Sequence, residues 1–478
     1  MFNFGEVALT VSSSADDHLT LRDLRSGAVL TTYKTGQTGG IGPHGVSITS
    51  CGQFALPLLL AASADRPVVN SWYWQKDQVH VKSTLAEKVP VIATSPDGLY
   101  IVGGSAQGRL FVWEIATGSL LKMTEAHYKP ITVIRFTDDG SHVVVGAEDA
   151  LVTVWRFSTI ATTPRAQRLA PQATPVHSLA DHSLPISDIH MGVDGFNCRF
   201  ATASMDRTCK LWELASGILL CSFVFPTSIS SVLVDPAELL LIAGGADGHI
   251  YPINIHEQSM STVAQQHQQQ RHGASFAGSA SAALDTFVES GRRFEGHSRA
   301  VSSLALSFDG TTLLSGGQDG AAIVWDVRSG QIVKTFAQHK GPVTNVFIFF
   351  RPPELMSLNA KRVLPIAAPL KRFLATEEGV TENDIVSGQP MRIADAAVDP
   401  SCAPCGLLPP AISSFPEQDA AATYHSLGLF EISASSTDPV AELDHLREQV
   451  AHLRQLNDKW QQVANKYQRF IADDLTQQ

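Results

Sequence analysis

Apolar and polar residues alternate in short runs along the first 350 residues of the chain. In residues 149–155, 206–212 and 319–325, an Asp is followed by an alternating run and by a Trp six positions later. Four more runs keep this spacing but change one end of it: residues 16–22, 66–72, 107–113 and 247–253. Alternation of this kind is typical of a β-strand. A unit that recurs about every 40 residues indicates a repeat architecture.

A second strand pair precedes each of these runs. Residues 91–103 and 303–314, for example, each contain an apolar run, an Asp-Gly pair and another apolar run. Asp-Gly favours a tight turn between two strands. Four strands per unit and seven units predict an all-β fold, a seven-bladed β-propeller over residues 1–350.

The repeat resembles that of the WD-repeat family, in which a buried tetrad of His, Ser or Thr, Asp and Trp ties the strands of a blade together. Two copies match in full: His182, Thr202, Asp206, Trp212 and His297, Ser315, Asp319, Trp325. A third copy, formed by His127, Asp149 and Trp155, has Val145 where the hydroxyl is expected. A buried carboxylate must be paired or hydrogen-bonded, and imidazole and indole N–H groups can contribute to that network. Because the set recurs at blade spacing, we interpret it as structural and not as catalytic.

The two chain ends predict how the ring closes. Residues 7–11 and 18–24 form two strands with Ser12 and Asp16 in tetrad positions, but no histidine and no first strand precede them. Both occur at the other end, as His339 and the apolar run 342–350. We therefore expect one blade built from both ends, with His339 facing Ser12 and Asp16. Such closure removes exposed sheet edges, which otherwise template aggregation.

Two repeats are lengthened by segments of low complexity, at about residues 158–178 and 256–293. The second contains a Gln-rich run and an Ala/Ser/Gly run, a composition that cannot bury enough apolar surface to order itself. His256, His267 and His272 lie there and could suggest metal binding, but a solvated surface loop fits the composition better. We predict surface insertions without a metal site.

Residues 351–438 are predicted to form an irregular arm. Its first part, 351–373, carries five basic residues and one acid, and its second, 374–438, carries ten acids and one base. The basic part could contact RNA phosphate or an acidic partner. We favour a solvated segment that crosses the propeller, because no aromatic residues are interleaved for base stacking. Cys402 and Cys405 form a lone C-x-x-C without a second ligand pair, so no zinc site is expected.

The last segment, residues 439–475, is predicted to be a coiled-coil-type helix. Asp438 suits the N-cap and Pro439 the first helical position. Apolar residues follow at spacings of three and four: Leu443, Leu446, Val450, Leu453, Trp460, Ala464, Tyr467 and Ile471. Asn457 occupies an a position, where Asn can fix register and oligomeric state. The helix is expected to pair with its own copy or with a partner's helix; the alternative is a helix folded back onto the propeller wall.

Charge and motif content exclude several classes of function. The net charge is −11, which argues against binding nucleic acid through an overall positive field. We find no secretory signal, no apolar run of membrane-spanning length and no disulfide framework among the six cysteines, so a reducing compartment and no membrane association are expected. A nucleophile elbow, a phosphate-cradling loop and a His–carboxylate metal set are all missing from the sequence. We predict a binding platform with no catalytic residues, no cofactor and no metal.

A closer resemblance suggests which platform this is. Propeller, arm and terminal heptad helix together resemble the WD-repeat subunit of the nuclear complex that assembles the large (pre-60S) ribosomal subunit, as do the stretches 113–115 with 126–128, 181–188 and 225–237. The resemblance implies a non-enzymatic nuclear and nucleolar scaffold that supports removal of the internal transcribed spacer. It also implies a helical-repeat scaffold partner, self-association through the terminal helix, and indirect contact with pre-ribosomal particles and an AAA-type remodelling ATPase; direct RNA contact is left open. The alternative is a WD-repeat adaptor of another assembly, such as a ubiquitin-ligase substrate receptor or a chromatin complex.

Overall fold

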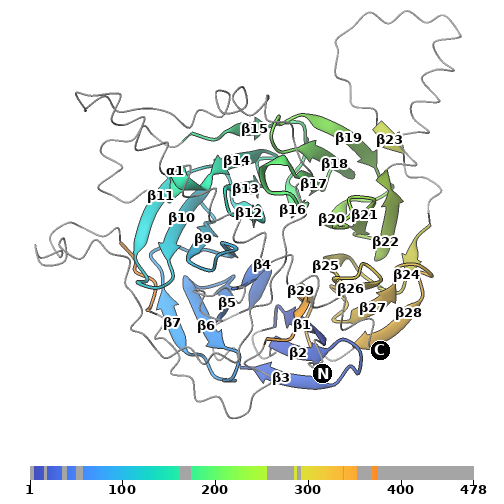
Figure 1. Cartoon of the computed structure of the whole chain (residues 1–478), viewed down its shortest axis with the longest axis horizontal. Helices are drawn as coiled ribbons and strands as arrows, with labels where there is room; N and C mark the ends of the chain where they lie inside the picture. The colour runs from blue at the N-terminus through green and yellow to red at the C-terminus, as the bar shows by residue number, and fades with distance from the viewer. Residues whose placement is uncertain are drawn as a thin grey trace, which may run out of the picture. The chain divides into compact units, whose positions relative to one another are not determined.

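Seven sheets, antiparallel except for one added outer strand, surround a central axis in the computed structural model (Figure 1). The structure describes residues 5–14, 19–34, 40–49, 58–161, 174–255, 285–287, 292–336, 339–352 and 368–373. All of these lie in one unit, Met1–Ser387. The predicted seven-bladed β-propeller is confirmed. The heptad helix and most of the arm lie outside the described residues.

The blades are numbered here in chain order, with the innermost strand named first. Blade 1 consists of β29 (Val343–Phe350), β1 (Glu6–Ser12), β2 (Leu19–Asp23) and β3 (Val29–Tyr33). Blade 2 consists of β4 (Ile41–Ile48), β5 (Leu58–Ser63), β6 (Val68–Tyr73) and β7 (Val81–Thr84). Blade 3 consists of β8 (Val91–Thr94), β9 (Tyr100–Gly104), β10 (Arg109–Glu114) and β11 (Leu120–Glu125).

The remaining blades follow the same order. Blade 4 consists of β12 (Ile131–Phe136), β13 (His142–Ala147), β14 (Val152–Arg156) and β15 (His177–Leu179). Blade 5 consists of β16 (Ile186–Met191), β17 (Arg199–Ser204), β18 (Thr208–Glu213), β19 (Leu219–Val224) and β23 (Asp285–Phe287). Blade 6 consists of β20 (Ile229–Val234), β21 (Leu240–Gly245), β22 (His249–Asn254) and β24 (Phe294–Glu295). Blade 7 consists of β25 (Val301–Leu306), β26 (Thr312–Gly317), β27 (Ala322–Asp326) and β28 (Ile332–Phe336).

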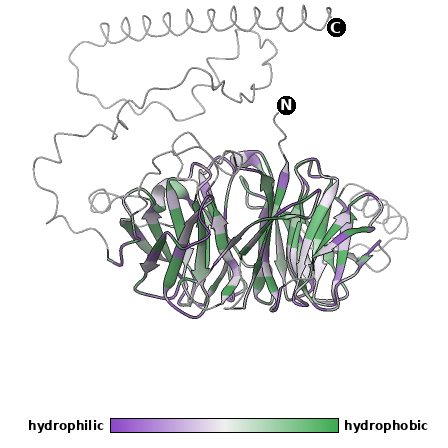
Figure 2. Ribbon diagram, turned by 90° about the horizontal axis from the view of Figure 1, so that it is seen from below, coloured by the Kyte–Doolittle hydropathy of each residue, from purple (hydrophilic) through white to green (hydrophobic). Residues whose placement is uncertain are grey.

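The core lies between blades, because each sheet is covered on both faces by its neighbours. Every residue of β5, β6 and β13 is buried, whereas the outer strands β3 and β28 each bury only one residue. Figure 2 shows apolar residues distributed along the strands of the whole ring. Burial on both faces explains the low content of charged residues, 17%.

The ring closes by pairing the two ends of the propeller sequence. β1 lies between β29 and β2, and its register with β29 runs from Glu6 opposite Phe350 to Val11 opposite Asn345. Blade 1 therefore takes its inner strand from the end of the propeller sequence and its other three strands from the beginning. Because β29 pairs with β1, β1 is not left as an unpaired edge strand where the chain closes the circle.

The two lengthened repeats are more ordered at their ends than the composition predicted. After β14 the chain forms α1 (Phe157–Ile160), whose Ile160 is fully buried, and β15 begins at His177. Within the second insertion, β23 pairs in parallel with β19 on the outside of blade 5. An outer strand presents unpaired backbone groups, so even a low-complexity segment can add to it. Residues 162–173, 256–284 and 288–291, including His256, His267 and His272, lie outside the described residues.

Candidate functional site

Two complete tetrads tie the strands of blades 5 and 7 together. In blade 5, His182 Nδ1 lies 2.9 Å from Asp206 Oδ2 and Nε2 lies 2.8 Å from Thr202 Oγ1. The Trp212 indole donates to the same hydroxyl at 2.9 Å. These hydrogen bonds are all formed if the His182 proton is on Nδ1 and is donated to the carboxylate. The Thr202 hydroxyl then donates to Nε2 and accepts from the indole.

Blade 7 repeats this geometry. His297 Nδ1 lies 3.1 Å from Asp319 Oδ2, Nε2 lies 2.7 Å from Ser315 Oγ, and Trp325 Nε1 donates to Ser315 Oγ at 2.8 Å. In both blades the carboxylate also accepts backbone N–H groups, from Ser183 at 3.1 Å and from Ser298 at 3.0 Å. The four side chains therefore join two loops and two strands of one blade.

Blade 4 obtains its hydroxyl from a different strand. His127 Nδ1 lies 3.0 Å from Asp149 Oδ2, as expected, but Nε2 lies 2.9 Å from Thr153 Oγ1. The Trp155 indole donates to that hydroxyl at 2.9 Å. Thr153 is the cross-strand partner of Val145. The hydroxyl therefore lies on the neighbouring strand and still contacts the His127 imidazole. The alternating pattern of β14 contains this signal, because residues directly opposite each other share one face of a sheet.

Ring closure uses Thr10 for the role that the sequence analysis assigned to Ser12. His339 Nε2 lies 2.8 Å from Thr10 Oγ1, which itself lies 2.6 Å from Thr20 Oγ1. Ser12 Oγ instead accepts the backbone N–H of Ser14 at 3.3 Å. Thr10 and Ser12 point to the same face of β1, since side chains two residues apart do so, and pattern alone could not separate them. Asp16 lies outside the described residues.

In the blades without a tetrad histidine, buried aromatic side chains find other acceptors for their N–H or O–H groups. Trp72 of blade 2 donates to the Lys34 carbonyl at 3.2 Å, and Trp113 of blade 3 donates to the Lys371 carbonyl at 3.0 Å. In blade 6, Ile253 stands at the Trp position, and Tyr251, two residues before it, donates to Asp247 at 2.6 Å. Burial, together with this bond, raises the pKa of Tyr251 to about 12.

The electrostatics of the tetrads match a structural role. Burial alone would raise the pKa of Asp206, but hydrogen bonds from His182 and Thr208 hold it well below its usual value. For Asp319 the opposing groups are the backbone N–H groups of Ala321 and Ser298, and the net effect is again a lowered pKa. A carboxylate held ionised and fully engaged has no proton to exchange with a substrate. Among the described residues, no group of three or more His, Cys, Asp or Glu is placed to hold a metal ion.

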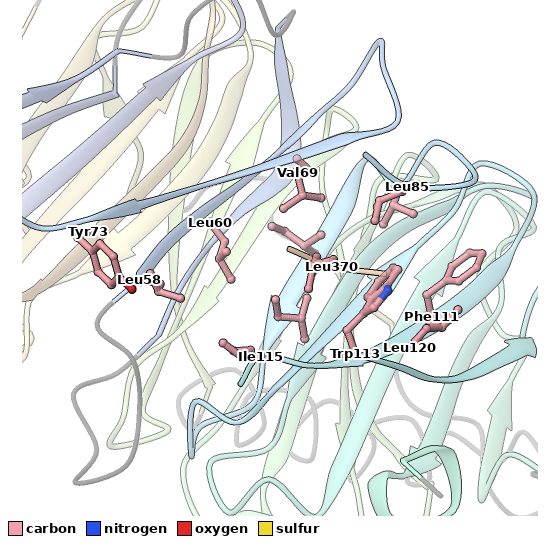
Figure 3. Close-up of a cluster of buried hydrophobic side chains, with 14 residues drawn as sticks. Leu58, Leu60, Val69, Tyr73, Leu85, Phe111, Trp113, Ile115, Leu120 and Leu370 are labelled. Carbon is pink, nitrogen blue, oxygen red and sulfur yellow. The ribbon is translucent and has the colours of Figure 1, made fainter. Parts of the chain in front are cut away.

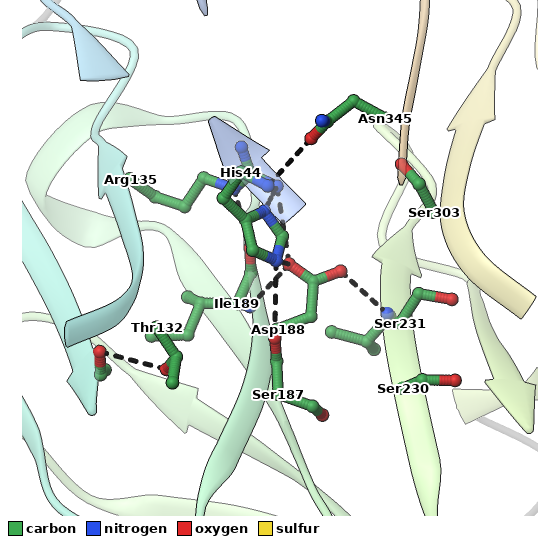
Figure 4. Close-up of polar contacts among 12 residues, drawn as sticks. His44, Thr132, Arg135, Ser187, Asp188, Ile189, Ser230, Ser231, Ser303 and Asn345 are labelled. Atoms are coloured by element: carbon green, nitrogen blue, oxygen red, sulfur yellow. Dashed lines mark hydrogen bonds and ion pairs between the residues drawn. The ribbon is translucent and has the colours of Figure 1, made fainter. Parts of the chain in front are cut away.

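A second polar network, which sequence analysis missed, crosses the centre of the ring (Figure 4). His44, in a left-handed conformation (φ 54°) within a bulge of β4, reaches from blade 2 to the Ser187 carbonyl of blade 5 at 3.3 Å. Asp188 beside it receives Arg135 Nη2 at 3.3 Å and the Val232 amide at 3.0 Å. Each residue looks unremarkable in its own strand, because only closure of the ring brings the strands together.

The network forms one wall of a cavity of about 490 Å³. Its lining combines Arg135 and His190 with apolar side chains that include Phe349. Burial lowers the pKa of His44, and a combination of burial and the nearby Arg135 lowers that of His190 to about 4, so both rings are neutral near pH 7. His190 Nδ1 accepts the Val234 backbone N–H at 3.3 Å, which requires an unprotonated nitrogen.

Exposed apolar side chains occupy both faces of the ring. On the face that carries the tetrad loops, Tyr128, Leu184 and Met205 are exposed in neighbouring blades 4 and 5, with Tyr128 96% exposed. On the opposite face, the rings of Phe308 and Phe350 lie in a tilted arrangement with their centroids 5.1 Å apart. Such side chains suit macromolecular contacts more than small-molecule chemistry.

Within the described part of the chain, no helix has the length and apolar character needed to cross a membrane. Comparison with known families finds the WD domain, G-beta repeat, in residues 118–156, 173–213 and 289–326. These three matches contain the Trp of the tetrads in blades 4, 5 and 7.

Comparison with individual proteins extends the likeness over most of the chain. WD repeat-containing protein 18 of Rattus norvegicus is 36% identical over 358 residues, 75% of this chain and 76% of the relative. Pre-rRNA-processing protein IPI3 of Yarrowia lipolytica is 32% identical over 331 residues, 68% of this chain and 72% of the relative. Protein ROOT INITIATION DEFECTIVE 3 of Arabidopsis thaliana is 29% identical over 95% of both chains. The chain belongs to the family of WD-repeat proteins that includes WD repeat-containing protein 18 and IPI3.

Proposed function

We propose that this protein is a non-enzymatic scaffold that supports pre-rRNA processing during maturation of the large ribosomal subunit. The observation that carries the proposal is the 32% identity to a relative named for pre-rRNA processing, over 72% of that relative. A second protein of that name, from Mycosarcoma maydis, is 29% identical over 350 residues. The role places the chain in the nucleus, in the nucleolus and nucleoplasm.

The arrangement of polar groups supports a scaffold. The His–Asp pairs of the three tetrads are hydrogen-bonded within blades 4, 5 and 7, and exposed apolar residues occur on both faces of the ring. The proposed partner is a helical-repeat scaffold protein that docks on the propeller. Pre-ribosomal particles and an AAA-type remodelling ATPase would be reached through the assembled complex. The 439–475 helix would join two copies.

Affinity purification of the tagged chain from nuclear extract tests this function. We expect a helical-repeat protein and pre-60S particles that contain internal transcribed spacer RNA to co-purify. Depletion of the protein should cause spacer-containing precursors to accumulate on a northern blot. Recovery of a cullin-type ligase or a chromatin complex without ribosomal precursors would instead support the adaptor alternative and contradict the proposal.

Matched variants on the two faces then locate the docking surface. The triple variant Tyr128→Ala, Leu184→Ala, Met205→Ala removes three exposed apolar side chains from the tetrad-loop face, and the double variant Phe308→Ala, Phe350→Ala removes an exposed aromatic pair from the other face. Loss of the helical-repeat protein from one purification, with unchanged thermal unfolding, identifies its face. Full recovery with both variants would contradict docking through these residues.

A further inference from the structure

Residues 368–373 follow the propeller sequence but lie against the side of the ring. They run between β7 of blade 2 and the turn before β11 of blade 3, shown in orange beside these strands in Figure 1. We call the surface that receives them the β7–β11 groove, formed by Ser83 and Thr84 on one side and by Trp113, Gly118 and Ser119 on the other. The sequence analysis had favoured a solvated segment here. Burial of Leu370 corrects this.

Leu370 is the anchor of the segment. It is 8% exposed and belongs to the apolar cluster between blades 2 and 3, together with Val69, Leu85 and Trp113 (Figure 3). The cluster draws on strands of both blades, so Leu370 fills a space that neither blade closes alone. Burial of its side chain removes apolar surface from water and so stabilises the bound segment.

Backbone hydrogen bonds hold the segment on both sides of this anchor. The Leu370 amide donates to Ser83 Oγ at 3.0 Å, and the Lys371 amide donates to the Gly118 carbonyl at 2.7 Å. The Lys371 carbonyl accepts Trp113 Nε1 at 3.0 Å. Such contacts recognise an extended peptide through its main chain, while the leucine pocket selects its side chain.

The groove is specifically shaped for this backbone. Gly118 has φ 65°, and a Cβ there would overlap the Pro369 carbonyl oxygen. Gly103 occupies the position that Thr202 has in blade 5, and a Cβ there would meet Val89 and Trp113. Blade 3 therefore cannot supply the tetrad hydroxyl from this strand, and a carbonyl from residues 368–373 satisfies the buried indole instead.

Basic side chains extend the contact. Lys371 Nζ donates to Ser119 Oγ at 3.2 Å, and Arg372 Nε donates to the Thr84 carbonyl at 2.9 Å. Phe373, by contrast, is 77% exposed.

We propose that the β7–β11 groove is a peptide-binding site whose ligand is the chain's own Leu-Lys-Arg segment at 370–372. Binding of this segment fixes the point on the propeller from which residues 374–478 depart, and it excludes other peptides from the groove. A covalently linked ligand acts at an effective concentration on the order of millimolar, so the site is occupied in the intact chain.

Hydrogen exchange on the unmodified full-length protein gives the first test. The Leu370 and Lys371 amides should exchange slowly, because both donate to groups of the propeller. Exchange of these two amides at the rate of an unstructured peptide would overturn the proposal without any variant.

A competition experiment gives the second test. A labelled peptide of residues 366–375 should bind the full-length Leu370→Asp variant at least ten-fold more tightly than it binds the wild type, measured by fluorescence anisotropy. The Phe373→Asp variant should behave like the wild type, and a peptide carrying Leu370→Asp should bind neither. Equal affinity for wild type and Leu370→Asp would contradict occupation in cis. If Leu370→Asp fails to fold, the exchange measurement alone decides.

Discussion

Thr153 and Thr10 supply hydroxyls at positions where the repeat pattern pointed elsewhere. In blade 4 the group moves across the strand pair from Val145 to Thr153, and in blade 1 it lies two residues before Ser12. In both blades the histidine is at its expected position in the repeat, and the hydroxyl it contacts lies on the face of the sheet that this histidine packs against. What the fold requires is thus a polar atom at a point in space, and more than one sequence position can provide it.

The Thr153→Val variant tests this interpretation in blade 4. Valine keeps the volume but leaves His127 Nε2 and Trp155 Nε1 without their shared hydroxyl, so the free energy of unfolding should fall by about 1–3 kcal/mol. Denaturant unfolding followed by circular dichroism measures the loss. Adding Val145→Thr to this variant should recover part of it. A double variant no more stable than the single one would contradict the exchange of positions.

His190 makes stability depend on pH in a defined window. Its pKa in the folded state is about 4, whereas an unfolded histidine titrates near 6.5, so the unfolded state takes up the proton first as the pH falls. The stability contributed by neutral His190 is therefore complete above about pH 6.5 and is lost progressively between pH 6.5 and 4. The protonated ring would also lose the bond from the Val234 amide.

The His190→Asn variant isolates this contribution. Asn does not titrate and can keep an acceptor near the position of Nδ1, so its melting temperature should fall less steeply between pH 6.5 and 4 than that of the wild type. Differential scanning fluorimetry across this range provides the comparison. Parallel curves for the two proteins would contradict this contribution of His190.

At the scale of elements, β1 carries the closure of the ring. It lies between β29 and β2 and contributes Thr10 to the His339 contact. The outer strands, in contrast, accept additions: β23 joins β19 from within an insertion, and residues 368–373 lie beside β7.

Deletion of residues 1–24 should unfold the propeller or cause it to oligomerise. It removes β1 and β2, exposes the edge of β29 and opens blade 1. Size-exclusion chromatography with light scattering detects the result. Deletion of residues 1–4, which precede β1, is the matched control and should leave the propeller folded. When the terminal helix is also removed, this control should be monomeric. A compact and equally stable protein after the longer deletion would refute the role of β1.

At the scale of the whole molecule, the net charge of −11 is unevenly placed along the chain. Residues 374–438 hold ten acids and one base, whereas residues 351–373 are basic. Part of that basic stretch is committed to the propeller, since Lys371 and Arg372 contact blades 2 and 3. The acidic stretch is therefore the part of the chain least suited to bind RNA.

Self-association is predicted to depend on the 439–475 helix. Replacing Leu446 and Leu453 by Asp puts two charges into the apolar seam and should convert a self-associated protein to a monomer, measured as molar mass by light scattering. His445→Asp with His452→Asp has the same spacing one residue away and should leave the mass unchanged. An unchanged mass for the leucine variant would exclude pairing through this seam.

Patterns along the chain are sufficient to predict the propeller, its seven blades, the three tetrad histidines with their Asp and Trp partners, and the pairing of the two ends of the propeller sequence. These follow from local periodicity and from residue types that recur at fixed spacing, which a linear reading can detect. It could not choose between Thr10 and Ser12, because both lie on one face of a strand.

The contacts between blades can be identified only from the tertiary structure. His44 reaches Ser187 across the ring, and Leu370 enters the cluster between blades 2 and 3, although each partner is far away in the sequence. Neither contact recurs from blade to blade, so the sequence contains no periodic pattern that would predict it. Leu370 belongs to no repeating pattern in the basic stretch 351–373, and its burial depends on a gap that exists only after both blades have formed.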